Sequence, residues 1–160
     1  KLAGLNLATA VWHLNTNVIP LIDVLCSGML ERFPRLRLLL GEGGVGWIPY
    51  LLAQADFCWV RNSNSGKSAP KPPLTMYPSE TWKRQCAAAF WYERVDNYVI
   101  EELGEDNIMW EDDYPHQLTD NGIGGGSAAY IEHSLQRVTD PTLRHKILAG
   151  NAARWFNLKG

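Results

Sequence analysis

Three short apolar runs, each followed by a segment with helical spacing, constrain this chain more than any other feature. The runs are LRLLL at 36–40, CAAAFWY at 86–92 and IMW at 108–110. Short runs of this kind are typical of strands that are buried on both faces of a sheet. No hairpin signal joins any two of them. The pattern therefore predicts an α/β fold in which parallel strands are joined by right-handed helical crossovers.

Helical patterns fill most of the sequence between and after these runs. Apolar residues recur at helical spacing, and prolines and glycines mark several predicted ends. The segment 62–80 contains four prolines, which predicts an extended surface loop that shapes a pocket or a subunit contact. The predicted helices span residues 20–33, 47–62, 94–104, 128–140 and 141–158.

The composition fits one globular domain, 1–160, and excludes several classes of partner. Lys and Arg number 15 and Asp and Glu number 17, for a net charge of −2, so we expect no nucleic acid and no membrane partner. No run approaches the roughly 18 apolar residues that span a bilayer. Three cysteines without a CxxC pair favour a reduced, cytoplasmic location. The chain starts at Lys1 rather than Met, and we expect a fragment of a longer protein.

Carboxylates follow two of the predicted strands. Glu42 comes after the first run, and the acidic triplet 111–113 comes directly after the third. In parallel α/β folds, ligands bind at the carboxyl ends of the strands, so these side chains fall where a site is expected. A carboxylate at a strand end can serve as a metal ligand, a general base or an orienting group. A solvated loop charge or a helix cap is the alternative.

Four segments resemble the amidohydrolase-related proteins, the branch that includes aminocarboxymuconate-semialdehyde decarboxylase and resorcylate decarboxylases. They are FPRLRLLLGEGGVGWIPYLL at 33–52, RQCAAAFWYER at 84–94, NIMWEDDYPH at 107–116 and KILAGNAARWFNL at 146–158. The resemblance implies the C-terminal portion of a (β/α)8 TIM barrel of the metal-dependent hydrolase type. It also implies a metal-dependent hydrolase or decarboxylase that acts on a small carboxylated or cyclic organic substrate. A non-catalytic remnant, or an assembly module without a metal, is the alternative.

The resemblance implies roles for individual residues. Asp113 matches the strand-eight aspartate that binds the divalent metal or activates its bound water. Alternation along an extended segment sends Glu111 to the same side, so Glu111 is expected to support Asp113. Glu42 stands where many family members carry a histidine, and it is expected to act as a base or acceptor or to brace the glycine turn. His116 is expected to assist proton transfer, or to be a loop histidine held by backbone bonds.

The expected cofactor is a divalent metal, with zinc first and manganese or magnesium as alternatives. The family's His-x-His pair and its fifth-strand histidine are not identifiable here, so the ligand set in this chain is incomplete. Trp47, near the predicted mouth, and Arg84 are expected to contact a small-molecule substrate; core packing and a solvated charge are their alternatives. A missing N-terminal half, or association into a homo-oligomer such as a dimer, is expected to complete the barrel.

Overall fold

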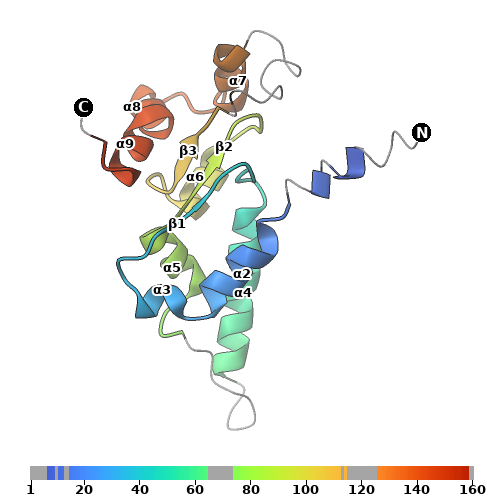
Figure 1. The fold of residues 1–160 in the computed structure, drawn as a ribbon, viewed down its shortest axis with the longest axis vertical. Coiled ribbons are helices and arrows are strands. Elements are labelled where there is room, and N and C mark those ends of the chain that lie inside the picture. Colours follow the sequence, from blue (N-terminus) through green and yellow to red (C-terminus); the bar gives the residue numbers. More distant parts are fainter. Residues whose placement is uncertain are drawn as a thin grey trace.

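A three-stranded parallel sheet organises the chain in this computed structural model (Figure 1), which describes residues 7–9, 11–12, 15–64, 74–112, 114 and 126–158. The strands are β1 (Leu38–Leu40), β2 (Cys86–Phe90) and β3 (Ile108–Trp110), in the order β1-β2-β3. Leu38 pairs with Cys86 and Ala88 pairs with Ile108, both in parallel register. The predicted parallel arrangement is confirmed, and the first two strands are shorter than the apolar runs that contain them.

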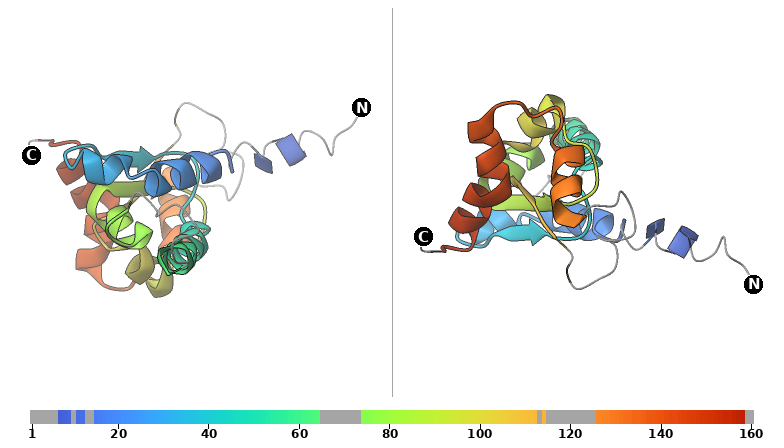
Figure 2. Two further views of the ribbon diagram at one scale, coloured as in Figure 1. Left: turned by 90° about the horizontal axis from the view of Figure 1, so that it is seen from below. Right: turned by 90° about the horizontal axis from the view of Figure 1, so that it is seen from above.

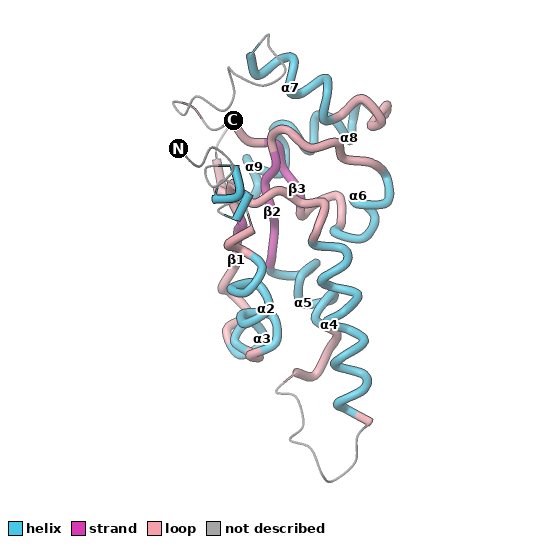
Figure 3. Tube along the Cα trace, turned by 90° about the vertical axis from the view of Figure 1, so that its right-hand side faces the viewer, coloured by secondary structure: helices cyan, strands magenta, loops and turns pink. Residues whose placement is uncertain are grey.

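Helices surround this sheet. Figure 3 shows the strands at the centre of the molecule, with α4, α5 and α6 together on one side. None of the helices in the described ranges is long and apolar enough to cross a membrane. The helical elements are α2 (Val18–Cys26), α3 (Met29–Arg32), α4 (Ile48–Ser63), α5 (Pro78–Gln85), α6 (Asn97–Leu103), α7 (Gly126–Ser134), α8 (Pro141–His145), η2 (Lys146–Gly150) and α9 (Asn151–Trp155).

The structure corrects one predicted helix and one predicted loop. The predicted helix 20–33 is divided at Gly28, which adopts a left-handed conformation with φ 74°, so that α3 starts a new direction. The predicted loop 62–80 ends early, because α5 begins at Pro78. Proline at the first helical position loses no hydrogen bond, and the Glu80 carboxylate accepts the Tyr77 N–H at 3.0 Å. Pro78 therefore opens a helix rather than extending the loop.

Side chains that alternate along the strands build two apolar clusters. One side of the sheet contributes Leu40, Ala88, Phe90 and Ile108 to the main core, which contains residues of α2, α4, α5 and α6. The intervening residues form a second cluster of Ala87, Ala89 and Met109, against which Leu39 and the α9 residues Ala152 and Trp155 pack. Burial on both faces explains why the strands have continuous apolar sequences.

The C-terminal helical stretch 141–155 stands at the side of the sheet opposite α4 (Figure 2). A π-helical turn, η2, lies between α8 and α9. The Asn151 side-chain amide donates to the carbonyl oxygens of Glu105 and Ile108, both at 2.6 Å, which fixes this stretch to β3. Arg37, just before β1, donates to the Trp155 carbonyl oxygen at 2.7 Å and lies 4.7 Å from the centre of the Trp155 ring. The last helix is therefore tied to both outer strands.

Candidate active site at the carboxyl ends of the strands

The carboxyl ends of the three strands lie at one edge of the sheet, and a glutamate follows each of them. Glu42 is two residues beyond β1, Glu93 is three beyond β2, and Glu111 comes directly after β3. The Glu111 N–H donates to the Phe90 carbonyl oxygen at 2.9 Å, which continues the pairing of β2 and β3 into this edge. The register of the parallel sheet thus gathers three carboxylates from positions far apart in the sequence.

Glu42 and Glu111 are joined directly. The backbone N–H of Glu42 donates to Glu111 Oε1 at 2.7 Å, and the Glu42 residue itself is exposed. Glu42 has φ 56°, a left-handed conformation that glycine adopts freely and that costs other residues roughly 1 kcal/mol or more. Strain of this kind is concentrated at functional sites. The contact between these two glutamates, which was not predicted from the sequence, uses the amide of Glu42 and not its carboxylate.

The turn 41–46 after β1 is held from several sides. Asn17 Nδ2 donates to the Gly41 carbonyl oxygen at 3.0 Å. Trp47 Nε1 donates to the Gly43 carbonyl oxygen at 2.7 Å. Glu93 Oε1 accepts the N–H of Gly46 at 2.8 Å and also the N–H of Val45. Side chains from three separate segments therefore fix the backbone on which Glu42 is carried.

The two consecutive glycines of this turn are required by different neighbours. A Cβ at Gly43 would overlap the Asn17 side-chain amide, and a Cβ at Gly44 would overlap the Glu93 carboxylate. Gly44 also has φ +69°, which disfavours any L side chain. The doublet therefore allows the side chains of Asn17 and Glu93 to approach the turn closely.

The residues after β3 have separate partners. Glu111 bonds to the turn after β1, whereas Asp112 Oδ1 accepts the Tyr114 N–H at 3.1 Å and its other oxygen accepts the Ser127 hydroxyl of α7. Asp113 and His116, the predicted metal-side carboxylate and its proton-transfer partner, lie outside the described residues. Among the residues that are described, no group of three or more His, Cys, Asp or Glu side chains could hold a metal ion.

Trp47 and Arg84, the two predicted substrate contacts, occupy different ends of the sheet. Trp47 is half-buried, next to the turn that its indole N–H braces. Arg84 belongs to α5, which ends directly before β2 begins, so it lies at the amino end of that strand. Its Nε donates to Gln85 Oε1 at 2.9 Å. The structure brings Trp47 to the edge that carries Glu42 and Glu111, and it does not bring Arg84 there.

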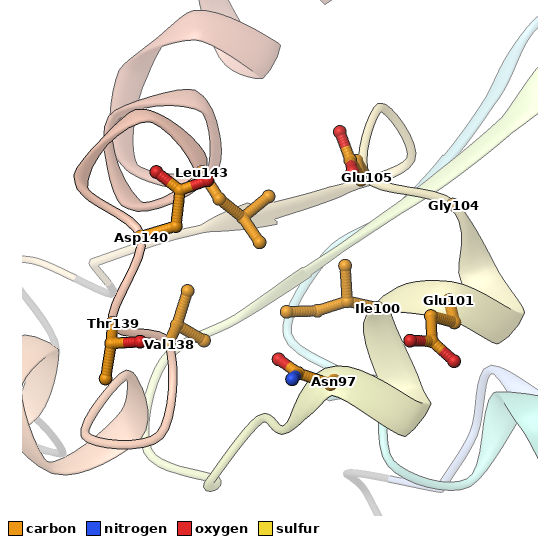
Figure 4. A pocket seen from close by; sticks show the side chains of 9 residues that line it. All are labelled: Asn97, Ile100, Glu101, Gly104, Glu105, Val138, Thr139, Asp140 and Leu143. Carbon is orange, nitrogen blue, oxygen red and sulfur yellow. The ribbon is translucent and has the colours of Figure 1, made fainter.

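A small polar hollow of about 260 Å³ opens beside Glu42. It is lined by Thr16, Asn17, Gly41 and Glu42, so amide and carboxylate groups face a space at the carboxyl end of β1. A larger hollow of about 510 Å³ lies between α6 and α8 (Figure 4), lined partly by Ile100, Glu105 and Leu143. Because Glu105 precedes β3, this second hollow is away from the edge where the three glutamates meet.

Asn17 and Glu93 belong to this edge and are not among the residues predicted from the sequence. Asn17 precedes α2 and Glu93 follows β2, so neither lies next to the turn in the chain. The glycine doublet signals a close approach by some group, but only the fold identifies that group.

Burial, followed by the negative charge of Glu93, raises the pKa of the neighbouring Tyr92 hydroxyl.

Comparison with known proteins decides the family. The family model for amidohydrolases matches residues 2–158. The chain belongs to the amidohydrolase family. The predicted resemblance and fold class are confirmed, and the parallel sheet with its helices is part of a TIM barrel of this family.

Several relatives of this chain are decarboxylases. A gamma-resorcylate decarboxylase of Polaromonas sp. is 26% identical over 134 residues, which are 82% of this chain and 37% of the relative. A gamma-resorcylate decarboxylase of Rhizobium sp. is 26% identical over 87% of this chain and 39% of its own. The chain thus spans about two fifths of the length of the curated relatives it matches.

Two solved structures show the same fold. The 5-carboxyvanillate decarboxylase of Sphingomonas paucimobilis has a TM-score of 0.61 and 29% identity, over 86% of this chain and 38% of that one. The dihydroxybenzoic acid decarboxylase of Polaromonas sp. JS666, with bound manganese and the inhibitor 2-nitroresorcinol, has a TM-score of 0.61 and 22% identity. The match covers 88% of this chain and 40% of that one. At that lower identity the second structure supports the fold alone.

Proposed function

We propose that this chain is the C-terminal part of a divalent-metal-dependent decarboxylase that acts on a hydroxylated aromatic carboxylic acid. The relatives named above act on resorcylate and carboxyvanillate, both aromatic acids with ring hydroxyl groups. The observation that carries the proposal is the bond between Glu42 and Glu111. It joins the ends of β1 and β3 at the edge where parallel barrels place their ligands.

The glutamates described at this edge do not by themselves form a group that could hold a metal ion. A carboxylate such as that of Asp113 suits manganese or magnesium as well as zinc. Asp113, next in sequence after Asp112, would hold the ion, with Glu111 nearby, and the remaining ligands would come from other strands of the barrel. The ion, when bound, would polarise an oxygen of the substrate and so favour the loss of CO2.

Decarboxylation requires one proton for each CO2 released, because the ring carbon that loses the carboxylate must gain a hydrogen. Glu42 is the residue of this chain that we assign to that proton transfer. Glu42 is exposed at the carboxyl end of β1, beside the hollow lined by Thr16 and Asn17. Its backbone N–H is bound by the Glu111 carboxylate. We assign a supporting role to His116, and we assign Trp47 to the wall of the substrate site.

Two measurements on the full-length protein test this proposal: its decarboxylase activity and its metal content. Purified protein is incubated with 2,6-dihydroxybenzoate and with 5-carboxyvanillate, CO2 release is followed, and bound metal is measured by mass spectrometry. We expect turnover and about one divalent ion per chain, with both lost in Asp113→Ala. Asp106→Asn removes a carboxylate that pairs with Lys146 and Arg154. This control variant is expected to keep both the turnover and the bound divalent ion. A wild-type protein without turnover and without a divalent ion would instead support a non-catalytic remnant.

A further inference from the structure

We infer that Glu93 is a positioning residue that holds Glu42 in place for the proposed reaction; the inference therefore rests on the function proposed above. Glu93 follows β2, the middle strand, and its carboxylate reaches the turn that begins after β1. No step of the reaction as described above uses it. Its contacts nevertheless determine the backbone geometry around Glu42.

The Glu93 carboxylate is bound to consecutive amides. Oε1 accepts the N–H groups of both Val45 and Gly46, while Oε2 occupies the space that a Cβ at Gly44 would fill. Glu93 is half-buried in this position. A charged acceptor that bonds two amides at once is stronger and more directional than a single neutral hydrogen bond. The turn is thus fixed a few residues after the strained residue Glu42.

Glu42 is consequently held at both ends of a short segment. Its own N–H is bound by Glu111, which follows β3, and the amides three and four residues later are bound by Glu93, which follows β2. Without the second attachment, Glu42 is expected to relax from φ 56° toward the conformations that non-glycine residues prefer. Such a movement would redirect the Glu42 carboxylate, and displacements of about 1 Å can reduce turnover by about 100-fold.

Three substitutions at Glu93 distinguish geometry from charge. Glu93→Gln keeps the length of the side chain and an oxygen that accepts both amides, so we expect it to retain most of kcat. Glu93→Asp keeps the charge but is one methylene shorter, and Glu93→Ala removes the acceptor. We expect kcat to fall by about 10-fold in Glu93→Asp and by about 100-fold in Glu93→Ala, with KM changed less than about 3-fold.

Glu31 supplies a matched control at the other end of the molecule. Its carboxylate also bonds consecutive amides, those of Thr75 at 3.0 Å and Met76 at 3.4 Å, and it lies on α3, away from the strand ends that carry Glu42 (Figure 1). Glu31→Ala is expected to lower the free energy of unfolding while leaving kcat unchanged. A general loss of stability would therefore not reproduce the effect expected at Glu93.

The experiment measures kcat and KM for the protein as the gene encodes it, together with hydrogen exchange at the Val45 and Gly46 amides. We expect these amides to exchange faster in Glu93→Ala and at the wild-type rate in Glu31→Ala. The inference is overturned if active wild-type protein and Glu93→Ala share the same kcat, if Glu93→Asp is more active than Glu93→Gln, or if exchange is unchanged. Absence of wild-type turnover on the aromatic acids would instead overturn the proposed function, while the exchange rates would still decide whether Glu93 holds the turn.

Discussion

The backbone N–H of Glu42 donates a 2.7 Å hydrogen bond to the carboxylate of Glu111, 69 residues further along the chain. The bond spans the middle strand and connects the first and third strand ends. A change in the side chain of Glu111 therefore acts on the backbone of Glu42. We therefore expect substitutions at Glu111 to change the position of Glu42 as well.

Glu111→Ala is expected to lower the free energy of unfolding by about 1 kcal/mol, because the Glu42 amide loses its charged acceptor. Glu111→Gln keeps an oxygen at the same position and should recover at least half of that loss. Urea denaturation of the wild type and both variants measures the difference. Equal loss in the two variants would mean that the charge of Glu111, and not its hydrogen bond, stabilises this edge.

Glu42→Gly is expected to separate stability from activity. Glycine accepts the left-handed backbone that Glu42 adopts, so the free energy of unfolding should rise by about 0.5–1 kcal/mol. Loss of the carboxylate should lower kcat about 100-fold, the contribution typical of one acid or base. Asn157, the other described non-glycine residue with positive φ, provides the control: Asn157→Gly should keep full activity. Unchanged turnover in Glu42→Gly would remove Glu42 from the mechanism.

Gly44→Ala should destabilise the protein more than Gly126→Ala does. The two glycines have nearly the same φ, +69° and +66°, but a Cβ at Gly44 would overlap the Glu93 carboxylate, whereas a Cβ at Gly126 would meet no atom of the described residues within 4 Å. Gly126→Ala therefore measures the conformational strain alone, about 1 kcal/mol. The excess in Gly44→Ala, read from thermal or urea unfolding, measures the overlap with Glu93. Similar losses in both variants would show that Glu93 moves aside freely.

Cys86 should resist alkylation in the folded protein, while Cys26 and Cys58 react. Cys86 is buried and the other two are exposed, and burial raises the pKa of the Cys86 thiol to about 12. Mass spectrometry of peptides after iodoacetamide treatment at pH 8, with and without urea, identifies the protected thiol. Labelling of Cys86 in the absence of urea would contradict its position in the core.

The raised pKa of the Cys86 thiol predicts a loss of protein stability in alkaline solution. The Cys86 thiol stays neutral in the folded state, while the unfolded thiol ionises near pH 9, the ordinary range for cysteine. Its contribution is therefore fully present below about pH 9 and is lost as the pH rises toward about 12. Unfolding free energies of the wild type and Cys86→Ala should differ in slope over this range. Parallel slopes would show that other groups control the alkaline transition.

The sequence predicted the parallel strands and most of the helices because both depend on local apolar periodicity. The third strand was predicted at 108–110, as observed, and Gly104 follows the last residue of α6. The division at Gly28 and the start of α5 at Pro78 were not predicted. A glycine within a helical pattern is compatible with continuation as well as with a turn, and a proline in a proline-rich segment does not by itself indicate a helix start.

The site was partly predictable for a related reason. Glu42 and Glu111 lie within two residues of strand ends, so their common edge follows from the predicted parallel strands. Asn17 and Glu93 approach the turn through tertiary contacts that no local pattern encodes. Arg84, predicted to contact substrate, precedes β2 and lies at the amino end of that strand. Because the strands are parallel, a residue that precedes a strand lies away from the edge that Glu42 and Glu111 share.

The contact of Arg37 with Trp155 has a consequence for how the chain folds during synthesis. The two residues are 118 positions apart, so the contact forms only after the ribosome has produced all three strands and the helix that follows them. Contacts with long sequence separation form slowly, because a long segment must first be ordered. Until Trp155 emerges, the second apolar cluster of Ala87, Ala89 and Met109 lacks the helix that packs on it. That interval is when a nascent chain would most need protection by a chaperone.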